Sequence, residues 1–225
     1  MQRETFMIRG VSRGMPVRQP LTQMAGEQIE VLGEVLRDEV NLAIWQRQLP
    51  APIGDFAQAL LAQGLPLAES MVLELADIDS PPNLTGLVAQ YSDLPGQQAF
   101  LADVAWLVSA FACLLDAKRI GLRLRILDKA MCPRFHVDHV PLRLITSYAG
   151  VGSQWLREGV MARRRLGDPA AEPGDEALIE RAEAGHVLLA KGEKWIGNEG
   201  GGLIHRSPQP PAGERRLLLT LDWLG

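Results

Sequence analysis

Apolar and polar residues follow two different patterns along the chain, and the change comes near Lys118. In residues 26–49 the apolar positions recur every three or four residues, which is the spacing of one face of an α-helix. Similar spacing predicts helices over residues 53–63, 67–75 and about 95–117, with prolines and glycines between them. The first half of the chain is therefore expected to be helical.

Beyond Lys118 the pattern changes to short segments typical of β-strands. In residues 121–127, leucine and isoleucine alternate with arginine, as expected for a strand with one buried face. Further strand-like segments, separated by glycine and proline, are residues 143–148, 187–190, 203–205 and 215–223. Residues 176–184 are expected to form a short helix or an irregular connection.

Helices followed by short strands with turns indicate an α+β protein whose β part is a sandwich or barrel. We expect two parts, a helical region over residues 1–118 and a β core over residues 119–225 that this region supports. The chain has 225 residues, enough for one large domain or one domain with a helical annex.

Composition and charge exclude some classes of function. The formal net charge is -4, which argues against a nucleic-acid binder that neutralises phosphates, and gives no support to binding at anionic membranes. Residues 1–10 lack the apolar core of a signal peptide. The longest apolar stretch, residues 99–117, contains Asp103 and Asp116 and suits a buried helix better than a membrane helix. We therefore expect a cytoplasmic protein.

Candidate chemistry is concentrated around a His-x-Asp sequence. Alternate residues of a strand point to the same side, so His136 and Asp138 can converge on one metal ion. A third ligand has to come from elsewhere, and His205 lies in another predicted strand. Two histidines and one carboxylate leave coordination positions open, which is the facial triad of non-haem Fe(II) oxygenases.

The sequence around this triad supports the interpretation of the short His-x-Asp motif as part of a metal site. An Ala-Gly turn, an apolar strand and Gly192 precede His205. Arg215 and Arg216 follow it and open the last predicted strand, where an arginine can form a bidentate pair with a carboxylate. Because these two arginines are adjacent, only one of them can point into a barrel.

In this order of motifs, residues 121–222 resemble the double-stranded β-helix of the 2-oxoglutarate- and Fe(II)-dependent oxygenases. The strings Cys-Pro-Arg-Phe-His-Val-Asp, Arg-Leu-Ile-Thr-Ser-Tyr and Leu-Ile-His-Arg-Ser-Pro also resemble an uncharacterised bacterial family, known only as a domain of unknown function. The second resemblance spans most of the chain and carries an association with zinc-homeostasis gene neighbourhoods.

The oxygenase resemblance implies roles for particular residues. His136, Asp138 and His205 would bind Fe(II), with Zn(II) as another candidate metal. Arg216 or Arg215 would hold the distal carboxylate of 2-oxoglutarate, the cosubstrate. The secondary candidates near the cosubstrate are Tyr148 and Arg143. Many such oxygenases carry Arg-x-Ser, whereas Leu217 and Leu218 follow Arg216 here, so that hydroxyl is absent.

The leading hypothesis is a dioxygenase that couples decarboxylation of 2-oxoglutarate to hydroxylation of a small-molecule or protein substrate. An alternative is a metal-binding accessory protein without redox catalysis, which Cys132 close to His136 would favour as a soft ligand. A third reading is a barrel without metal that serves as a binding module. Both a structural and a functional interpretation remain open for four other residues: His139, His186, Trp155 and Trp195.

Overall fold

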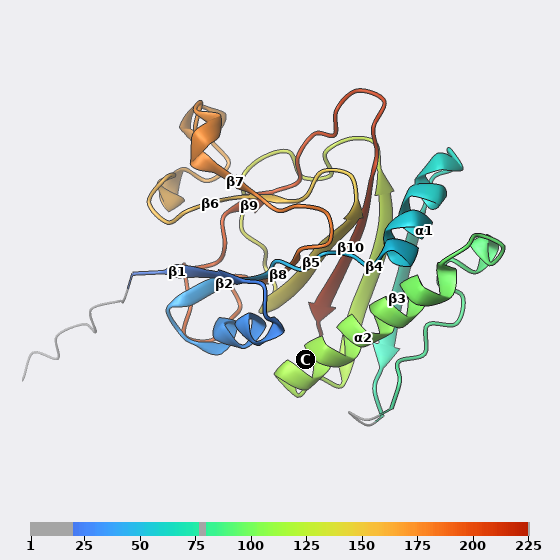
Figure 1. Ribbon diagram of the computed structural model, residues 1–225. Coiled ribbons are helices and arrows are strands. Elements are labelled where there is room, and N and C mark those ends of the chain that lie inside the picture. Colours follow the sequence, from blue (N-terminus) through green and yellow to red (C-terminus); the bar gives the residue numbers. More distant parts are fainter. Residues whose placement is uncertain (1–19, 77–79, 225) are drawn as a thin grey trace, which may run out of the picture.

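The computed structural model describes residues 20–76 and 80–224, in which two β-sheets and two α-helices are formed (Figure 1). The expectation that residues 1–10 lack a signal peptide lies outside the described residues. The helices are α1 (Ala51–Ala62) and α2 (Gln97–Leu115). The strands are β1 (Thr22–Gly26), β2 (Val40–Trp45), β3 (Ala68–Glu74), β4 (Arg119–Leu127), β5 (Leu142–Ala149), β6 (Gln154–Leu156), β7 (Ile179–Arg181), β8 (Val187–Lys191), β9 (His205–Arg206) and β10 (Arg216–Trp223). Short 3-10 helices span Ile29–Leu36, Ala89–Tyr91, Arg163–Arg165, Pro169–Ala171 and Glu176–Leu178.

The larger sheet has seven strands in the order β1-β2-β8-β5-β10-β4-β3, and the smaller has three in the order β7-β6-β9. All neighbours pair antiparallel except β1 and β2. From β4 onward the chain alternates between the two sheets: β4, β5, β8 and β10 enter the larger one, and the segments between them enter the smaller one. An isolated bridge between His136 and His205 adds the chain around His136 to the smaller sheet. This alternation is that of a double-stranded β-helix, a form of jelly roll.

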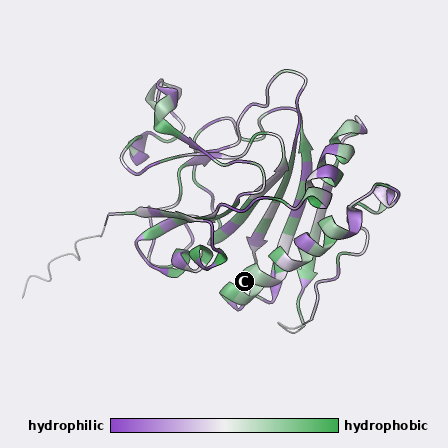
Figure 2. Cartoon of the chain, in the orientation of Figure 1, coloured by the Kyte–Doolittle hydropathy of each residue, from purple (hydrophilic) through white to green (hydrophobic). Residues whose placement is uncertain are grey.

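Hydrophobic side chains bury both faces of the larger sheet. On one face, α1 and α2 pack through residues such as Phe56, Phe100 and Phe111 against leucines of β4, β5 and β10. On the other face, Ile145, Leu188 and Leu218 contact Trp155 and neighbours from the smaller sheet. Figure 1 shows both helices on one side of the larger sheet, and Figure 2 shows hydrophobic residues along its central strands. A second hydrophobic cluster therefore fills part of the space between the two sheets.

The expected helix over residues 26–49 is wrong. This stretch contains the end of β1, a 3-10 helix over Ile29–Leu36 and strand β2. Strand β2 lies inside the sheet with Leu42 and Ile44 on the barrel side and Ala43 on the helix side. A strand buried on both faces has a nearly continuous apolar sequence, so its spacing does not distinguish it from a helix.

The expected helix over residues 67–75 is also wrong, because these residues form edge strand β3. The segment is rich in alanine, glutamate, methionine and leucine, which favour helices in isolation. Pairing with β4 along the whole strand overrides that preference. Since β2 and β3 both pair with strands that follow residue 118, the two expected parts of the chain share one sheet.

The remaining elements follow the sequence pattern more closely. The helices expected over residues 53–63 and 95–117 correspond to α1 and α2, and the alternating segments correspond to β4, β5, β8 and β10. Strand β6 was not expected, and it has three residues. The class predicted from the sequence, helices with a two-sheet β part, is confirmed in this coarse form.

Helix α2 has the length and composition of a membrane-crossing helix, alone among the helices of the described residues. One face of α2 packs in the helix–sheet core through residues such as Phe100, Val104 and Leu107. This packing agrees with the expectation of a buried helix over residues 99–117.

A buried ion pair joins α2 to the larger sheet. Arg47, just after β2, contacts Asp103 of α2 through two bonds of 2.6 and 2.8 Å. The Tyr148 hydroxyl of β5 donates to the same carboxylate at 2.6 Å, and the Arg47 Nε donates to the Gly185 carbonyl. Both charged side chains are nearly buried, with 8% and 11% of their surface exposed. Burial and the Asp103 charge together raise the pKa of Tyr148 well above its usual value, so Tyr148 stays a neutral donor.

Replacement of Asp103 by alanine is expected to lower the free energy of unfolding by about 3–5 kcal/mol, because Arg47 is left buried without its counter-ion. Urea denaturation of the purified protein measures this loss. Glu74→Ala is a suitable control, since it breaks an ion pair with Arg119 in which both side chains are at least half exposed. Glu74→Ala should lower the free energy of unfolding by no more than about 1 kcal/mol. Equal losses for the two variants would contradict the structural role of the Arg47–Asp103 pair.

Candidate metal centre

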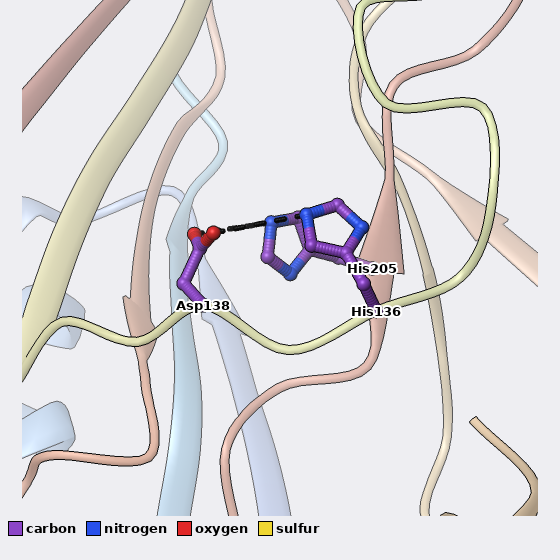
Figure 3. A group of neighbouring side chains, drawn as sticks. All are labelled: His136, Asp138 and His205. Atoms are coloured by element: carbon purple, nitrogen blue, oxygen red, sulfur yellow. Dashed lines mark ion pairs between the residues drawn. The ribbon is translucent and has the colours of Figure 1, made fainter. Parts of the chain in front are cut away.

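Backbone pairing brings the two histidines of the predicted triad together. His136 N donates to His205 O at 3.0 Å, and His205 N donates to His136 O at 2.9 Å. The two imidazole rings lie side by side with centroids 4.6 Å apart. Figure 3 shows the Asp138 carboxylate directed toward both rings. The structure therefore brings His205 to the pair formed by His136 and Asp138, which lies far from it in the sequence.

The ligand-capable atoms of His136, Asp138 and His205 all lie within 4.8 Å of one another. The closest approaches are 3.3 Å from His205 Nε2 and 3.7 Å from His136 Nε2 to the Asp138 carboxylate. Two ligands that sit at right angles about 2.1 Å from one ion are about 3 Å apart, so small adjustments suffice. Imidazole and carboxylate together suit Fe(II) or Zn(II), and the donor set fits such a metal.

Each imidazole is oriented by a hydrogen bond to a backbone carbonyl. His136 Nδ1 lies 2.9 Å from Arg134 O, and His205 Nδ1 lies 3.0 Å from Leu203 O. A carbonyl oxygen only accepts, so Nδ1 carries the proton in both rings. Nε2 of each ring then faces the Asp138 carboxylate, to which it donates when the imidazole is protonated, and loss of that proton frees its lone pair for a metal ion.

Asp138 is a carboxylate that remains ionised. Burial alone would raise its pKa, but hydrogen bonds from His136 and His205 and the charges of His205 and Arg143 hold it well below the usual range. The hydrogen bond to Asp138 in turn raises the pKa of His136. The cluster is thus an anionic carboxylate beside two imidazoles, which is the state that binds a cation.

A close backbone approach fixes the loop that carries Asp138. Glu193 N donates to Asp138 O at 2.9 Å, and Gly192 N donates to Pro141 O at 2.9 Å. A Cβ at position 192 would come within 2.1 Å of Val140 O and 2.6 Å of Asp138 O. Only glycine allows this contact, which explains the glycine that the sequence places after the apolar strand.

Arg216 is fully buried between the two sheets. Its guanidinium donates to the hydroxyls of Ser147 at 2.9 Å, Ser153 at 3.2 Å and Ser207 at 3.3 Å. Its Nε has no hydrogen-bond partner, and none of the ion pairs in the described part of the chain includes Arg216. Burial lowers its pKa to about 10, and the side chain is still cationic at neutral pH. A buried cation of this kind is costly without an anion, so the geometry fits a carboxylate ligand.

Arg215 and Tyr148 do not lie where the cosubstrate roles require them, and both predictions are corrected. Arg215 donates to the carbonyls of Leu61 and Leu65 near the end of α1. It points to the helix side because adjacent strand residues face opposite ways. Tyr148 also faces the helices, where it contacts Phe100 and Asp103.

Arg143 lies in the barrel beside the cluster, but its partners are carboxylates of the protein. Its Nη1 donates to Asp138 Oδ2 at 2.7 Å. Its Nε and Nη2 donate to the two oxygens of Asp222 at 2.6 and 3.1 Å. The structure thus places Arg143 against the candidate ligand Asp138, and its contact with a cosubstrate stays a prediction.

The secondary candidates lie outside the cluster. Cys132 is exposed and is not among the cluster residues, so the soft ligand that would favour a metal accessory protein is not found beside His136. His139 is exposed. His186 lines a surface groove of about 510 Å³ along β1. Trp155 is buried and donates to Gln23, and Trp195 packs against Trp223.

Sequence reasoning missed the residues that surround the arginines. Ser147, Ser153 and Ser207 come from three separate segments and supply hydroxyls in place of the absent Arg-x-Ser serine. Ser147 could have been found, because it lies four positions after Arg143 and so shares its face of the strand. Ser153 and Ser207 have no such signal, since they lie outside the regular strands.

Two of three comparisons relate the chain to known proteins. A family described as "Protein of unknown function (DUF1826)" matches residues 26–222. No curated protein sequence matches the chain. The structure is similar to a "Putative oxygenase from Shewanella oneidensis", with 11% identity, 90% of each chain covered and a TM-score of 0.50.

Two further structures are more distant. Dioxygenase for auxin oxidation 1 from Arabidopsis thaliana, in a complex with 2-oxoglutarate, is 11% identical over 91% of this chain and 92% of that chain, with a TM-score of 0.46. A prolyl-4-hydroxylase from Pseudomonas putida is 14% identical over 86% and 96%, with a TM-score of 0.42. At these identities the likeness concerns the fold.

Proposed function

The chain belongs to the DUF1826 family of unknown function, and we propose that it is a non-haem Fe(II)- and 2-oxoglutarate-dependent dioxygenase. One observation carries the proposal. A His-Asp-His cluster and a buried guanidinium, which has no carboxylate partner among residues 20–76 and 80–224, lie in the same barrel. Ser207, which contacts Arg216, is two residues from His205, so the two sites are neighbours on one segment. The shared fold with a protein named "Putative oxygenase" supports the same function.

Three residues would hold the metal. His136 and His205 would offer Nε2 and Asp138 a carboxylate oxygen, and a set of three protein ligands would leave coordination positions for other ligands. Bound Fe(II) would supply the O₂ chemistry that couples decarboxylation of 2-oxoglutarate to hydroxylation of a substrate. The protein's part is to fix these ligands and to keep the open positions facing the barrel.

Arg216 would hold the distal carboxylate of the cosubstrate. Its three serine neighbours accept hydrogen bonds from the guanidinium through Oγ, so their own hydroxyl hydrogens remain free to donate. A carboxylate placed there would receive donors from both the guanidinium and the hydroxyls. Apolar neighbours such as Ile145 and Leu218 exclude water and strengthen this pairing.

Wild-type protein tests the proposal directly. Under anaerobic conditions, Fe(II) and 2-oxoglutarate together should give a visible charge-transfer band, and admission of O₂ should produce succinate. Succinate can form slowly without the substrate, so the assay does not require the substrate to be known. If the protein binds Zn(II) tightly and yields neither the band nor succinate, a metal-binding role without redox catalysis replaces the proposed function.

A further inference from the structure

A chain of alternating charges leads from the protein surface to the candidate metal centre. Arg123 of β4 donates to Asp222 Oδ2 at 2.6 Å, Asp222 accepts two bonds from Arg143, and Arg143 donates to Asp138. The exposed fraction of the side chains falls from 50% at Arg123 to 4% at Asp222. Neither Asp222 nor Arg123 touches the cluster itself, so their effect on it passes through Arg143.

Asp222 holds Arg143 in one orientation. The Nε and Nη2 atoms of the guanidinium engage the two oxygens of Asp222, which leaves Nη1 directed at Asp138 Oδ2. Such a two-point contact fixes the plane of a guanidinium as well as its position. Contacts within the larger sheet therefore fix the hydrogen bond from Arg143 to Asp138.

We propose that Arg143, clamped by Asp222, is a positioning residue that limits Asp138 to metal binding through one carboxylate oxygen. Oδ2, the oxygen that Arg143 holds, lies 3.3 Å from His205 Nε2, and Oδ1 lies 3.7 Å from His136 Nε2. The guanidinium competes with a metal ion for Oδ2, so a contact of both carboxylate oxygens with one metal ion is disfavoured. A single-oxygen contact keeps one more coordination position open than a two-oxygen contact does. The inference rests on the proposed metal site and adds a reason why its open positions persist.

The charges predict opposite changes in metal affinity for variants of Arg143 and Asp222, which a general loss of structure would not produce. Arg143 places a cation beside the site of a divalent metal, so its removal should strengthen metal binding. Asp222 compensates that cation, so its neutralisation should weaken metal binding. Loss of folding or of local order would weaken binding in both variants.

The test measures the affinity of the protein for Mn(II) alone by calorimetry, without cosubstrate. Arg143→Met should bind Mn(II) about tenfold more tightly than wild type, and Asp222→Asn about tenfold more weakly. The double variant should lie between them. With Co(II) in place of Mn(II), the visible spectrum of Arg143→Met should differ from that of wild type, because a second carboxylate oxygen joins the metal.

Arg123→Met is the matched control. It removes an arginine from the same Asp222, yet its side chain is half exposed and has no contact with Asp138. Its Mn(II) affinity should stay within about threefold of wild type, since exposed charges are screened. Weaker binding in both Arg143→Met and Asp222→Asn, or no change in either, overturns the inference. Absence of Mn(II) binding in the wild-type protein would instead overturn the proposed metal site.

Discussion

Replacement of His205 by alanine is expected to reduce the affinity for divalent metal by more than about 100-fold and to abolish succinate formation. Loss of a carboxylate or carbonyl that orients a histidine ligand already lowers metal affinity by about 10–100-fold, and loss of a ligand itself lowers it further. In this chain the imidazole is one of three candidate ligands, and its Nε2 lies 3.3 Å from Asp138 Oδ2. Metal content after purification, and titration with Mn(II), would measure the effect.

His139→Ala provides the control, because it removes an exposed histidine next to Asp138 in sequence but outside the cluster. Its metal affinity should equal that of wild type. The His205 ring is buried beside His136, so thermal unfolding of both variants should be compared as well. A folded His205→Ala protein that retains wild-type metal content would contradict the metal site.

The fold was predictable where one face of an element is polar. Helix α1 and strand β4 each have such a face, and their types agree with the sequence pattern. Strand β2 is buried on both faces, and strand β3 consists of helix-favouring residues at a sheet edge. Their type depends on pairing with strands more than 40 positions away, which local spacing does not contain.

The centre of the site was predictable to a similar degree. The two-residue spacing of His136 and Asp138 and the position of His205 in another strand indicated a cluster, and the structure brings these three residues together. Tyr148 was misplaced, although it lies five positions after Arg143. Two strand residues separated by an odd number of positions point to opposite faces, so the sequence itself argued against placing both Tyr148 and Arg143 inside the barrel.

The partners of the arginines were less predictable, because they depend on contacts between the sheets. Ser153 and Ser207 approach Arg216 from segments next to the smaller sheet, and Asp222 meets Arg143 across the β5–β10 pairing. Only the register of the strands defines these contacts. Adjacent Arg215 and Arg216 were expected to face opposite sides, but the sequence alone did not indicate which one faces the barrel.

Replacement of Arg216 by methionine is expected to weaken binding of 2-oxoglutarate by about 100-fold or more. Removal of one partner from a buried, hydrogen-bonded charge pair costs about 2–5 kcal/mol, and each 1.4 kcal/mol is about tenfold in affinity. Titration of the Mn(II)-loaded protein with 2-oxoglutarate measures the change without turnover. Arg215→Met is the control, since this neighbouring arginine faces α1 and should leave the affinity unchanged.

The stability of the same variants separates a ligand-binding arginine from a structural one. Arg216 is a buried cation whose partners in the described residues are three neutral hydroxyls, so an apolar side chain of similar length removes an uncompensated charge. Without cosubstrate, Arg216→Met should therefore unfold at a temperature no lower than wild type. With 2-oxoglutarate at about 100 times its Kd, the wild-type protein should gain about 2.7 kcal/mol of stability, and the variant should gain almost none at the same concentration. A large loss of stability without cosubstrate, together with an unchanged gain on its addition, would mean that Arg216 supports the barrel and that 2-oxoglutarate does not bind there.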